Sequence, residues 1–304
     1  MKFLPTIRSH TGLNATRTWY PRAAWLVLLL GIVAGCSQPA PEVTATSGSS
    51  DSTESGPATA PDPALRPAAS GKLRIAAASD LKFALAKIVA EFEQAHPGAQ
   101  VSVTVGSSGQ LFSQLSHEAP FDLFLSADIE YANNLAQVGH GFSAGAFPYA
   151  RGHIVLWKPG AVRADGAKLH PDQLREGNVK TIAVANPKTA PYGRAAIEAL
   201  RTLWLYEALE PKLVYGESVA QTAQMVESGA ADVGIIALSL ALSPALRDRG
   251  HFWPFPSDSY QPLIQGGVIL SWAEDRALAE DFREFLINGP GATHLADFGF
   301  DPPH

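Results

Sequence analysis

Residues 75–92 join a short apolar strand to an amphipathic helix, and this unit constrains the fold more than any other stretch. The strand ends in small residues, and Ser79 and Asp80 follow it. Apolar residues then recur at helical spacing: Leu81, Leu85, Ile88, Val89 and Phe92. Ser79 or Asp80 is predicted as the N-cap of this helix, whose unpaired N–H groups could bind an anion. A simple cap would also explain Ser79, so an anion site is indicated only if several such turns converge.

The same order of strand, small-residue turn and helix recurs along the chain. The alternating residues 100–105 predict a strand, and residues 106–110 a turn into a helix through Leu115. Further strands are predicted at 121–125, 152–157, 181–185, 212–215, 232–236 and 267–272. Further helices are predicted at 129–138, 194–203, 220–228, 276–287 and 292–300. The proline-containing stretch 253–262 is predicted to be coil, and a glycine-rich loop precedes residue 152.

This alternation predicts an α/β fold with two lobes, each a mostly parallel sheet flanked by helices. The chain is expected to cross between the lobes near Arg151 and again near Gln261. Lobe 1 would comprise residues 71–151 and 262–304, and lobe 2 residues 152–261. A site between such lobes closes on its ligand by a hinge motion.

Composition argues against a nucleic-acid partner. The net charge is −6, and the first 35 residues hold four basic residues and no acidic one, so the remainder carries −10. Nucleic-acid binding requires a basic footprint, which this balance does not provide. Any bound anion must therefore be held by local dipoles, and a monomer is expected.

The only cysteine, Cys36, follows a short apolar run that is preceded by basic residues. This arrangement predicts a secretory signal in residues 1–35. Residues 33–36 also resemble the bacterial lipobox, which implies a lipid anchor on Cys36 and a location in the periplasm or cell envelope. An ordinary signal peptide with a chance cysteine and an uncleaved anchor are the alternatives. Residues 36–70 are rich in Ser, Pro, Ala, Thr and Gly and are predicted to be a disordered tether.

Enzyme and metal motifs are incomplete. His117 and Glu118 begin a zinc-protease pattern, but Phe121 stands where the second histidine is needed. Residues 106–109 are one residue short of a G-x-S-x-G nucleophile elbow, and residues 139–141 follow a predicted helix, unlike a dinucleotide loop. The nine histidines show no ligand-like spacing. The sequence thus nominates no catalytic residue, no cation ligand and no cofactor.

Five short segments occur in order between residues 73 and 300: 76–79 (AAAS), 106–109 (GSSG), 119–128 (APFDLFLSAD), 190–193 (APYG) and 227–235 (ESGAADVGI). Together they strongly resemble the molybdate-binding solute receptors of bacterial ABC importers, and FDLFLSAD is the most specific piece. The resemblance implies a two-lobed periplasmic-binding-protein fold of type II with the ligand in the cleft between the lobes. It also implies the membrane subunits of an ABC importer as partner and molybdate or tungstate as ligand.

The resemblance also implies particular ligand residues. Ser79 and Ser108 match the two hydroxyl ligands of lobe 1, and Val219 matches a position that supplies a backbone N–H. Tyr192 matches a position that supplies a backbone N–H and, as tyrosine, a hydroxyl; its alternative role is that of a packing aromatic. One departure is Ala237, because some members place a ligand tyrosine there.

These residue types suit a divalent oxyanion. Molybdate presents only acceptors, and Ser hydroxyls, Tyr hydroxyls and backbone N–H groups can all donate without adding a cation. Asp80 would repel such an anion, so its side chain is predicted to point away, as a cap or paired with a base such as Lys82. Competing interpretations are a receptor for sulfate, phosphate or a phosphonate, a ferric receptor, and a secreted phosphoester hydrolase.

Overall fold

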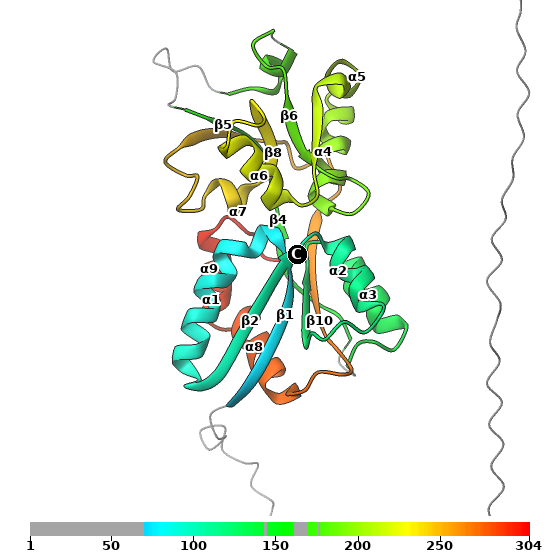
Figure 1. Ribbon diagram of the computed structural model, residues 1–304, viewed down its shortest axis with the longest axis vertical. Coiled ribbons are helices and arrows are strands. Elements are labelled where there is room, and N and C mark those ends of the chain that lie inside the picture. Colours follow the sequence, from blue (N-terminus) through cyan, green and yellow to red (C-terminus); the bar gives the residue numbers. More distant parts are fainter. Residues whose placement is uncertain (1–69, 143–144, 161–168, 176) are drawn as a thin grey trace, which may run out of the picture. The chain divides into compact units, whose positions relative to one another are not determined.

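Two mixed five-stranded sheets form the framework of this computed structural model, which describes residues 70–142, 145–160, 169–175 and 177–304 (Figure 1). The predicted signal sequence, Cys36 and nearly all of the predicted tether lie outside the described residues. Each sheet, with the helices packed against it, is called a lobe below. The two-lobed α/β fold predicted from the sequence is confirmed.

The first sheet has the order β2-β1-β3-β10-β4. Its strands are β1 (Ser70–Ala78), β2 (Gly98–Gly106), β3 (Leu123–Ser126), β4 (Phe147–Gly152) and β10 (Leu263–Ile269). Strands β2, β1 and β3 pair in parallel, whereas β10 pairs antiparallel with both β3 and β4. Because β10 alone is reversed in this sheet, the sheet is mostly parallel, as the sequence predicted.

The second sheet has the order β7-β6-β8-β5-β9 and the same pattern of directions. Its strands are β5 (Ile154–Pro159), β6 (Ile182–Ala185), β7 (Leu213–Gly216), β8 (Val233–Ala237) and β9 (Gly250–Pro254). Strand β5 is antiparallel to β8 and β9, while β6 is parallel to β7 and β8. The chain passes from one sheet to the other between β4 and β5, and returns between β9 and β10.

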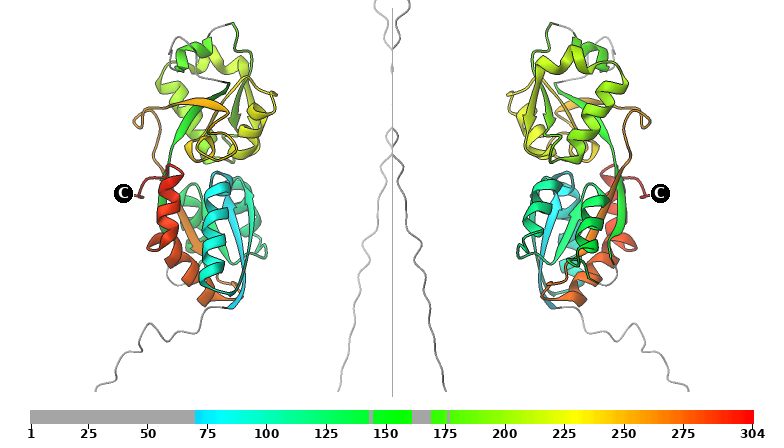
Figure 2. Two further views of the ribbon diagram at one scale, coloured as in Figure 1. Left: turned by 90° about the vertical axis from the view of Figure 1, so that its left-hand side faces the viewer. Right: turned by 90° about the vertical axis from the view of Figure 1, so that its right-hand side faces the viewer.

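Helices lie between the strands in the chain and after the last strand. The first lobe carries the 3-10 helix η2 (Ser79–Leu81) and the helices α1 (Lys82–Ala95), α2 (Ser108–Leu115), α3 (Ile129–Gln137), α8 (Arg276–Ile287) and α9 (Pro290–Asp297). The second carries η3 (Pro171–Arg175), α4 (Pro191–Thr202), α5 (Tyr206–Leu209), η4 (Glu210–Lys212), α6 (Val219–Glu227) and α7 (Leu238–Ala241). Figure 2 shows α8 and α9, orange to red, beside the first sheet together with α1 in cyan.

Helical periodicity explains the packing of the first lobe. The apolar residues Leu85, Ile88 and Phe92 of α1 are at most 1% exposed, because they lie on the face turned to the sheet. Phe92 meets Phe282 of α8 edge to face, with ring centroids 5.0 Å apart. Trp157 of β5, 1% exposed, lies in the core of the second lobe.

Two strands depart from the sequence prediction. Strand β4 lies in the predicted glycine-rich loop, and β9 includes the start of the predicted coil. Both are edge strands: β4 pairs with the strand β10 and, at Arg151 alone, with Asp301, and β9 pairs with the strand β5. Each contains a proline, Pro148 or Pro254, which an edge strand tolerates because one side of its ladder is unpaired.

The predicted N-cap is also wrong. Ala78 occupies the N-cap position of η2, and neither η2 nor α1 has a side-chain cap. Ser79 and Asp80 lie inside η2 and are buried, so their polar groups are engaged elsewhere.

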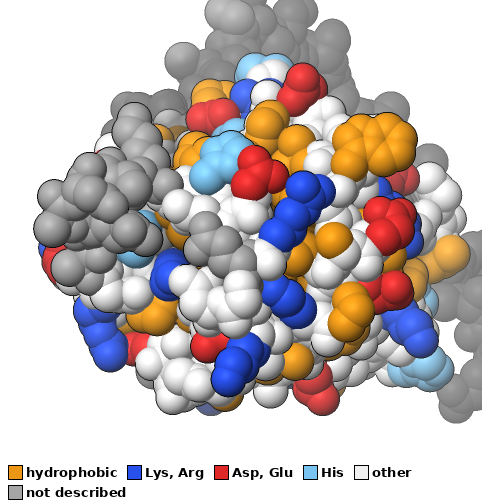
Figure 3. All heavy atoms as spheres, turned by 90° about the horizontal axis from the view of Figure 1, so that it is seen from above, with side chains coloured by type: hydrophobic (Ala, Val, Ile, Leu, Met, Phe, Trp, Pro, Cys, Tyr) orange, Lys and Arg blue, Asp and Glu red, His pale blue; other side chains and the backbone are white. Residues whose placement is uncertain are grey.

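The end of the second lobe that faces away from the first lobe carries charges of both signs on its surface. Acidic and basic side chains lie interspersed with exposed hydrophobic ones in Figure 3. Such mixing is ordinary for a solvated face. Among the helices in the described ranges, none is long and apolar enough to cross a membrane.

Candidate functional site

The four predicted ligand residues all lie just beyond the carboxyl end of a strand. Ser79 follows β1 in η2, Ser108 begins α2 after β2, Tyr192 lies in the first turn of α4 after β6, and Val219 begins α6 after β7. Each of the four is at most 3% exposed. In open α/β sheets, ligands bind beyond the carboxyl ends of the strands, so these positions suit a binding site.

Ser79 joins the first lobe to the second. The backbone N–H of Ala220, in the first turn of α6, donates to Ser79 Oγ at 3.3 Å. Ala220 is the neighbour of Val219 in the chain. The structure therefore brings the predicted ligands Ser79 and Val219 together, although they come from different lobes.

Ser108 lies at the N-terminus of α2. Its Oγ accepts a hydrogen bond of 3.0 Å from the backbone N–H of Ala127, and the adjacent Ser107 caps the helix by accepting from Gln110 N. The register of β1 and β2 pairs Ala78 with Gly106, so the turns that hold Ser79 and Ser108 leave neighbouring strand ends.

The N-terminus of α2 also contacts the second lobe. The backbone N–H of Gly109 donates to the carbonyl oxygen of Thr189 at 2.9 Å. Thr189 precedes α4, which carries Tyr192. A Cβ at Gly109 would lie 2.7 Å from that carbonyl oxygen, so this approach of two backbones requires glycine.

Two backbone N–H groups remain available at helix N-termini. Among the described residues, neither the N–H of Tyr192 nor that of Val219 has a hydrogen-bond partner. First-turn amides have no partner within their own helix, and they lie at the positive end of its dipole. They can therefore donate to a bound anion.

Asp80 does not behave as predicted. Its side chain is 1% exposed, and its Oδ2 accepts from the Tyr192 hydroxyl at 2.9 Å and from Gln265 Nε2 at 2.6 Å. It neither caps a helix nor pairs with Lys82, whose ammonium lies over the Phe83 ring instead. The prediction failed because the partners of Asp80 are distant in sequence and converge only through the fold.

Burial raises the pKa of Asp80 to about 6, against the opposing effect of the hydrogen bonds from Gln265 and Tyr192. Its second oxygen, Oδ1, is buried without a hydrogen-bond partner in the described part of the chain. Burial likewise raises the pKa of Tyr192 well above its usual value. The Tyr192 hydroxyl therefore keeps its proton and donates it to the Asp80 carboxylate, so it has no further proton to donate to a ligand.

Two further members of this cluster, Gln265 and Tyr149, were not among the predicted site residues. Gln265, on β10, is fully buried, and its Oε1 accepts from the Tyr149 hydroxyl at 2.8 Å. The Tyr149 hydroxyl also lies 3.0 Å from the Ser126 carbonyl oxygen. A glutamine within an apolar strand was the available signal, since buried polar groups need partners.

The start of α4 is packed directly on β6. A Cβ at Gly193 would lie 2.1 Å from the Ala185 carbonyl oxygen, so no larger residue fits. The N-terminal turn that carries the Tyr192 N–H is therefore held against the sheet by backbone contact.

An ion pair joins the lobes near this turn. Arg194 of α4 pairs with Asp128, and its Nη1 donates to the Tyr131 hydroxyl at 3.2 Å. A cavity of about 360 Å³ lies alongside, with Pro191, Arg194 and Gln261 in its wall.

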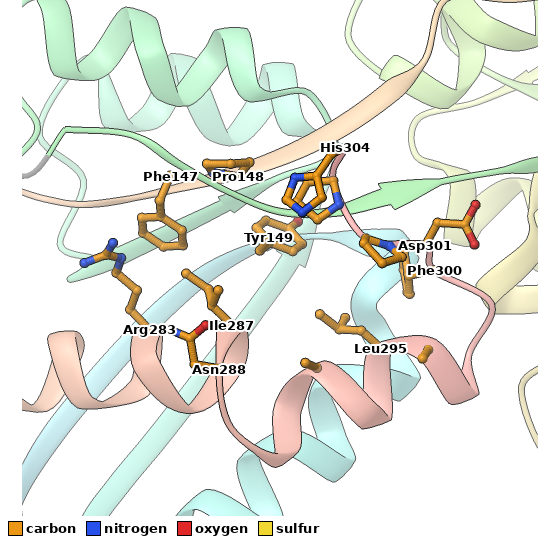
Figure 4. Close-up of a pocket in the computed structure, with 14 residues that line it drawn as sticks. Phe147, Pro148, Tyr149, Arg283, Ile287, Asn288, Leu295, Phe300, Asp301 and His304 are labelled. Atoms are coloured by element: carbon orange, nitrogen blue, oxygen red, sulfur yellow. The ribbon is translucent and has the colours of Figure 1, made fainter.

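A separate cavity of about 490 Å³ lies between β4, α8, α9 and the last residues (Figure 4). Its wall is mainly apolar, and Arg283 at one end lies over the Phe147 ring at 4.9 Å. None of the predicted ligand residues lines it. In the described ranges, no group of three or more His, Cys, Asp or Glu side chains could hold a metal ion.

The two mixed sheets and the helix N-termini that meet between them are those of a two-lobed solute-binding receptor. The chain belongs to the bacterial extracellular solute-binding proteins, whose family model matches residues 73–301.

Its relatives include molybdate-binding proteins. It is 36% identical to the molybdate-binding protein ModA of Azotobacter vinelandii over 75% of this chain and 88% of the relative. It is 35% identical to ModA of Rhodobacter capsulatus over 77% of this chain and 90% of the relative. The solved periplasmic molybdate-binding protein of Azotobacter vinelandii superposes with a TM-score of 0.69 at 32% identity, covering 76% of this chain and all of that one. The family resemblance seen in the sequence is confirmed.

Proposed function

We propose that this protein captures molybdate, or tungstate, and delivers it to the membrane subunits of an ABC importer without chemistry on the ligand or a cofactor. The contact between Ser79 and the first turn of α6 carries the proposal, because it brings a hydroxyl of one lobe to the helix N-terminus of the other, where the N–H of Val219 is available. The family is one of extracellular solute-binding proteins, and the relatives named above are all molybdate-binding by name.

Each ligand residue has a distinct role in this proposal. Ser79 and Ser108 donate their hydroxyl protons to the oxyanion, while their Oγ atoms accept from backbone amides. Tyr192 and Val219 donate backbone N–H groups from the first turns of α4 and α6. All four are neutral donors, which match an anion that presents only acceptors. Ala237 is buried at the end of β8 and supplies no side-chain donor.

The lobe boundaries predicted from the sequence belong to the proposal. Lobe 1 would comprise residues 71–151 and 262–304, and lobe 2 residues 152–261. Strands β4 and β10 lie in the first sheet and β5 and β9 in the second, which supports crossings near Arg151 and Gln261. Hinge closure about these crossings would bring the four donors around the ligand.

Titration calorimetry on the protein tests the ligand class. Heat is expected with molybdate and with tungstate, and none with sulfate or phosphate at the same concentrations. Binding of sulfate or phosphate instead would make the protein a receptor for another tetrahedral oxyanion. Turnover of a phosphoester would overturn the proposal of a receptor.

Ser108→Ala is expected to weaken molybdate binding by about 1 to 3 kcal/mol, the range for a hydrogen bond to a charged group. Calorimetry on the purified variant measures this loss. Ser113→Ala is the matched control, because Ser113 lies on the same helix with its side chain exposed. Wild-type affinity in Ser108→Ala would show that the site lies elsewhere.

The signal sequence in residues 1–35, the lipid anchor on Cys36 and the tether 36–70 are also part of the proposal, as is a monomeric receptor in the cell envelope. Cys36→Ala is expected to move the protein from the membrane fraction to the soluble fraction, because the mature chain would lose its acyl group. Immunoblotting of the two fractions measures the shift. An unchanged distribution would rule out the lipid anchor.

A further inference from the structure

Asp80 is bonded to the opposite lobe through both its side chain and its main chain. Its Oδ2 accepts from the hydroxyl of Tyr192 on α4, and its carbonyl oxygen accepts from the hydroxyl of Ser239 on α7 at 2.8 Å. The same Oδ2 accepts from Gln265, which belongs to the first lobe. One carboxylate oxygen thus ties a helix of the second lobe to a strand of the first.

The surroundings of this contact leave little freedom. Gly152, at the end of β4, lies directly against these side chains. A Cβ at Gly152 would lie 2.2 Å from the Tyr192 hydroxyl and 2.7 Å from Gln265 Nε2. The Gln265 side chain is itself fixed, because its Oε1 accepts from Tyr149. Asp80, Tyr192 and Gln265 are all at most 2% exposed, so water does not compete for these bonds.

We propose that Asp80 is a positioning residue that latches the two lobes together through Tyr192 and Gln265. The inference rests on the proposed function for its ligand. Asp80 makes no contact with the oxyanion in this scheme. It engages the Tyr192 hydroxyl, so that Tyr192 presents only its backbone N–H to the ligand, and it slows the reopening that releases the ligand.

The proposed latch predicts how a substitution changes the rate of molybdate release and the rate of association. Tyr192→Phe keeps the ring and the backbone N–H and removes only the bonded hydroxyl. It is expected to speed release of molybdate about tenfold, the factor for one buried hydrogen bond to a charged group. The association rate is expected not to fall, because the lobes of the free protein must open before ligand enters and loss of the latch makes opening more frequent.

A double-mutant cycle separates the latch from a direct ligand role. The Tyr192 hydroxyl also accepts from Gln265 Nε2 at 3.1 Å, so if the hydroxyl acts through the latch, the effect of Tyr192→Phe on the release rate is clearly reduced in an Asp80→Ala background. If the hydroxyl binds the oxyanion directly, the effect of Tyr192→Phe is undiminished in that background, and the latch is refuted. Stopped-flow release of molybdate into excess tungstate gives the four rates.

Tyr149→Phe is the matched control, because it removes a buried hydroxyl whose bonds to Gln265 and Ser126 stay within the first lobe. Because Tyr149 helps to hold Gln265 but makes no bond to the other lobe, the substitution is expected to lower stability and to change the release rate much less than Tyr192→Phe does. Gly152→Ala is a second route to the same effect as Tyr192→Phe, because its methyl group displaces the Tyr192 hydroxyl without changing any charge.

Small-angle scattering of the proteins without ligand adds a readout that does not depend on molybdate. Tyr192→Phe and Gly152→Ala are expected to have a larger radius of gyration than wild type and Tyr149→Phe, since their lobes open more often. Equal radii for all four proteins would overturn the latch. A wild-type protein that fails to bind molybdate would refute the proposed function, and the scattering comparison would still test the latch.

Discussion

Gly109→Ala is expected to weaken molybdate binding by roughly 30- to 1,000-fold while the protein remains folded. The new methyl group would lie 2.7 Å from the Thr189 carbonyl oxygen and 3.0 Å from the Tyr131 hydroxyl. It would also break the hydrogen bond from Gly109 N to Thr189, which joins the lobes. An overpacked contact costs about 1–3 kcal/mol and the lost bond about 1 kcal/mol more, which gives the stated range.

Most of this cost falls on the closed form, because Thr189 belongs to the other lobe and moves away when the lobes open, whereas the nearby Tyr131 hydroxyl is the end of a side chain that can shift. Calorimetry should therefore show weaker binding, while the melting temperature without ligand changes little. Gly177→Ala is the matched control, since a Cβ at Gly177 meets nothing within 4 Å. Unchanged affinity in Gly109→Ala would mean that ligand binding does not require this contact.

Asp80→Asn is expected to remove a pH dependence of stability worth about 3 kcal/mol. The pKa of Asp80 rises from 3.8 to about 6 in the folded protein. Between about pH 4 and pH 6 the folded state holds a proton on Asp80 that the unfolded chain has lost, so the free energy of unfolding falls as the pH rises. Above that window the full penalty, about 1.4 kcal/mol for each pKa unit, is present.

The asparagine amide is neutral at every pH, so in the variant this position does not lower the free energy of unfolding as the pH rises. Urea unfolding of both proteins at pH 4.5 and pH 7.5 measures most of this difference: because pH 4.5 already lies inside the window, the variant gains about 2 kcal/mol relative to wild type on going to the higher pH. This comparison cancels any change in hydrogen-bond strength that the amide brings, since that change is the same at both values. Asp258→Asn, at an exposed position, should keep the wild-type difference. A variant with the wild-type pH dependence would show that Asp80 ionises normally.

Local patterns determined most of the fold that the sequence could predict. Helical periodicity placed α1, α3, α6 and α8 within a few residues of their observed bounds. The two missed strands, β4 and β9, each contain a proline and use only one edge for pairing. Their assignment depends on a partner strand about 100 residues away, which no local window contains.

The candidate site also contains some residues whose positions could be predicted from local sequence and others whose contacts could not. The positions of Ser79 and Ser108 could be predicted because each directly follows a strand, and the strand end determines where it lies. The bonds of Asp80 could not, because Tyr192 and Gln265 reach it from α4 and from the reversed strand β10. Electrostatic reasoning treated Asp80 as unsuited to an anion and proposed a base near in sequence as its partner, whereas its partners are buried groups distant in sequence.

The contact between Gly193 and the Ala185 carbonyl oxygen has a consequence for discrimination between oxyanions. Molybdate and sulfate share charge and shape, so a receptor can separate them only by size. A donor on a flexible side chain would follow a smaller anion inward and bind it almost as well. The N–H of Tyr192 cannot follow in this way, because its helix turn already rests on the backbone of β6 with no side chain between them. Stiffness of the main chain, more than the chemistry of any donor, would then set the smallest oxyanion that this protein retains.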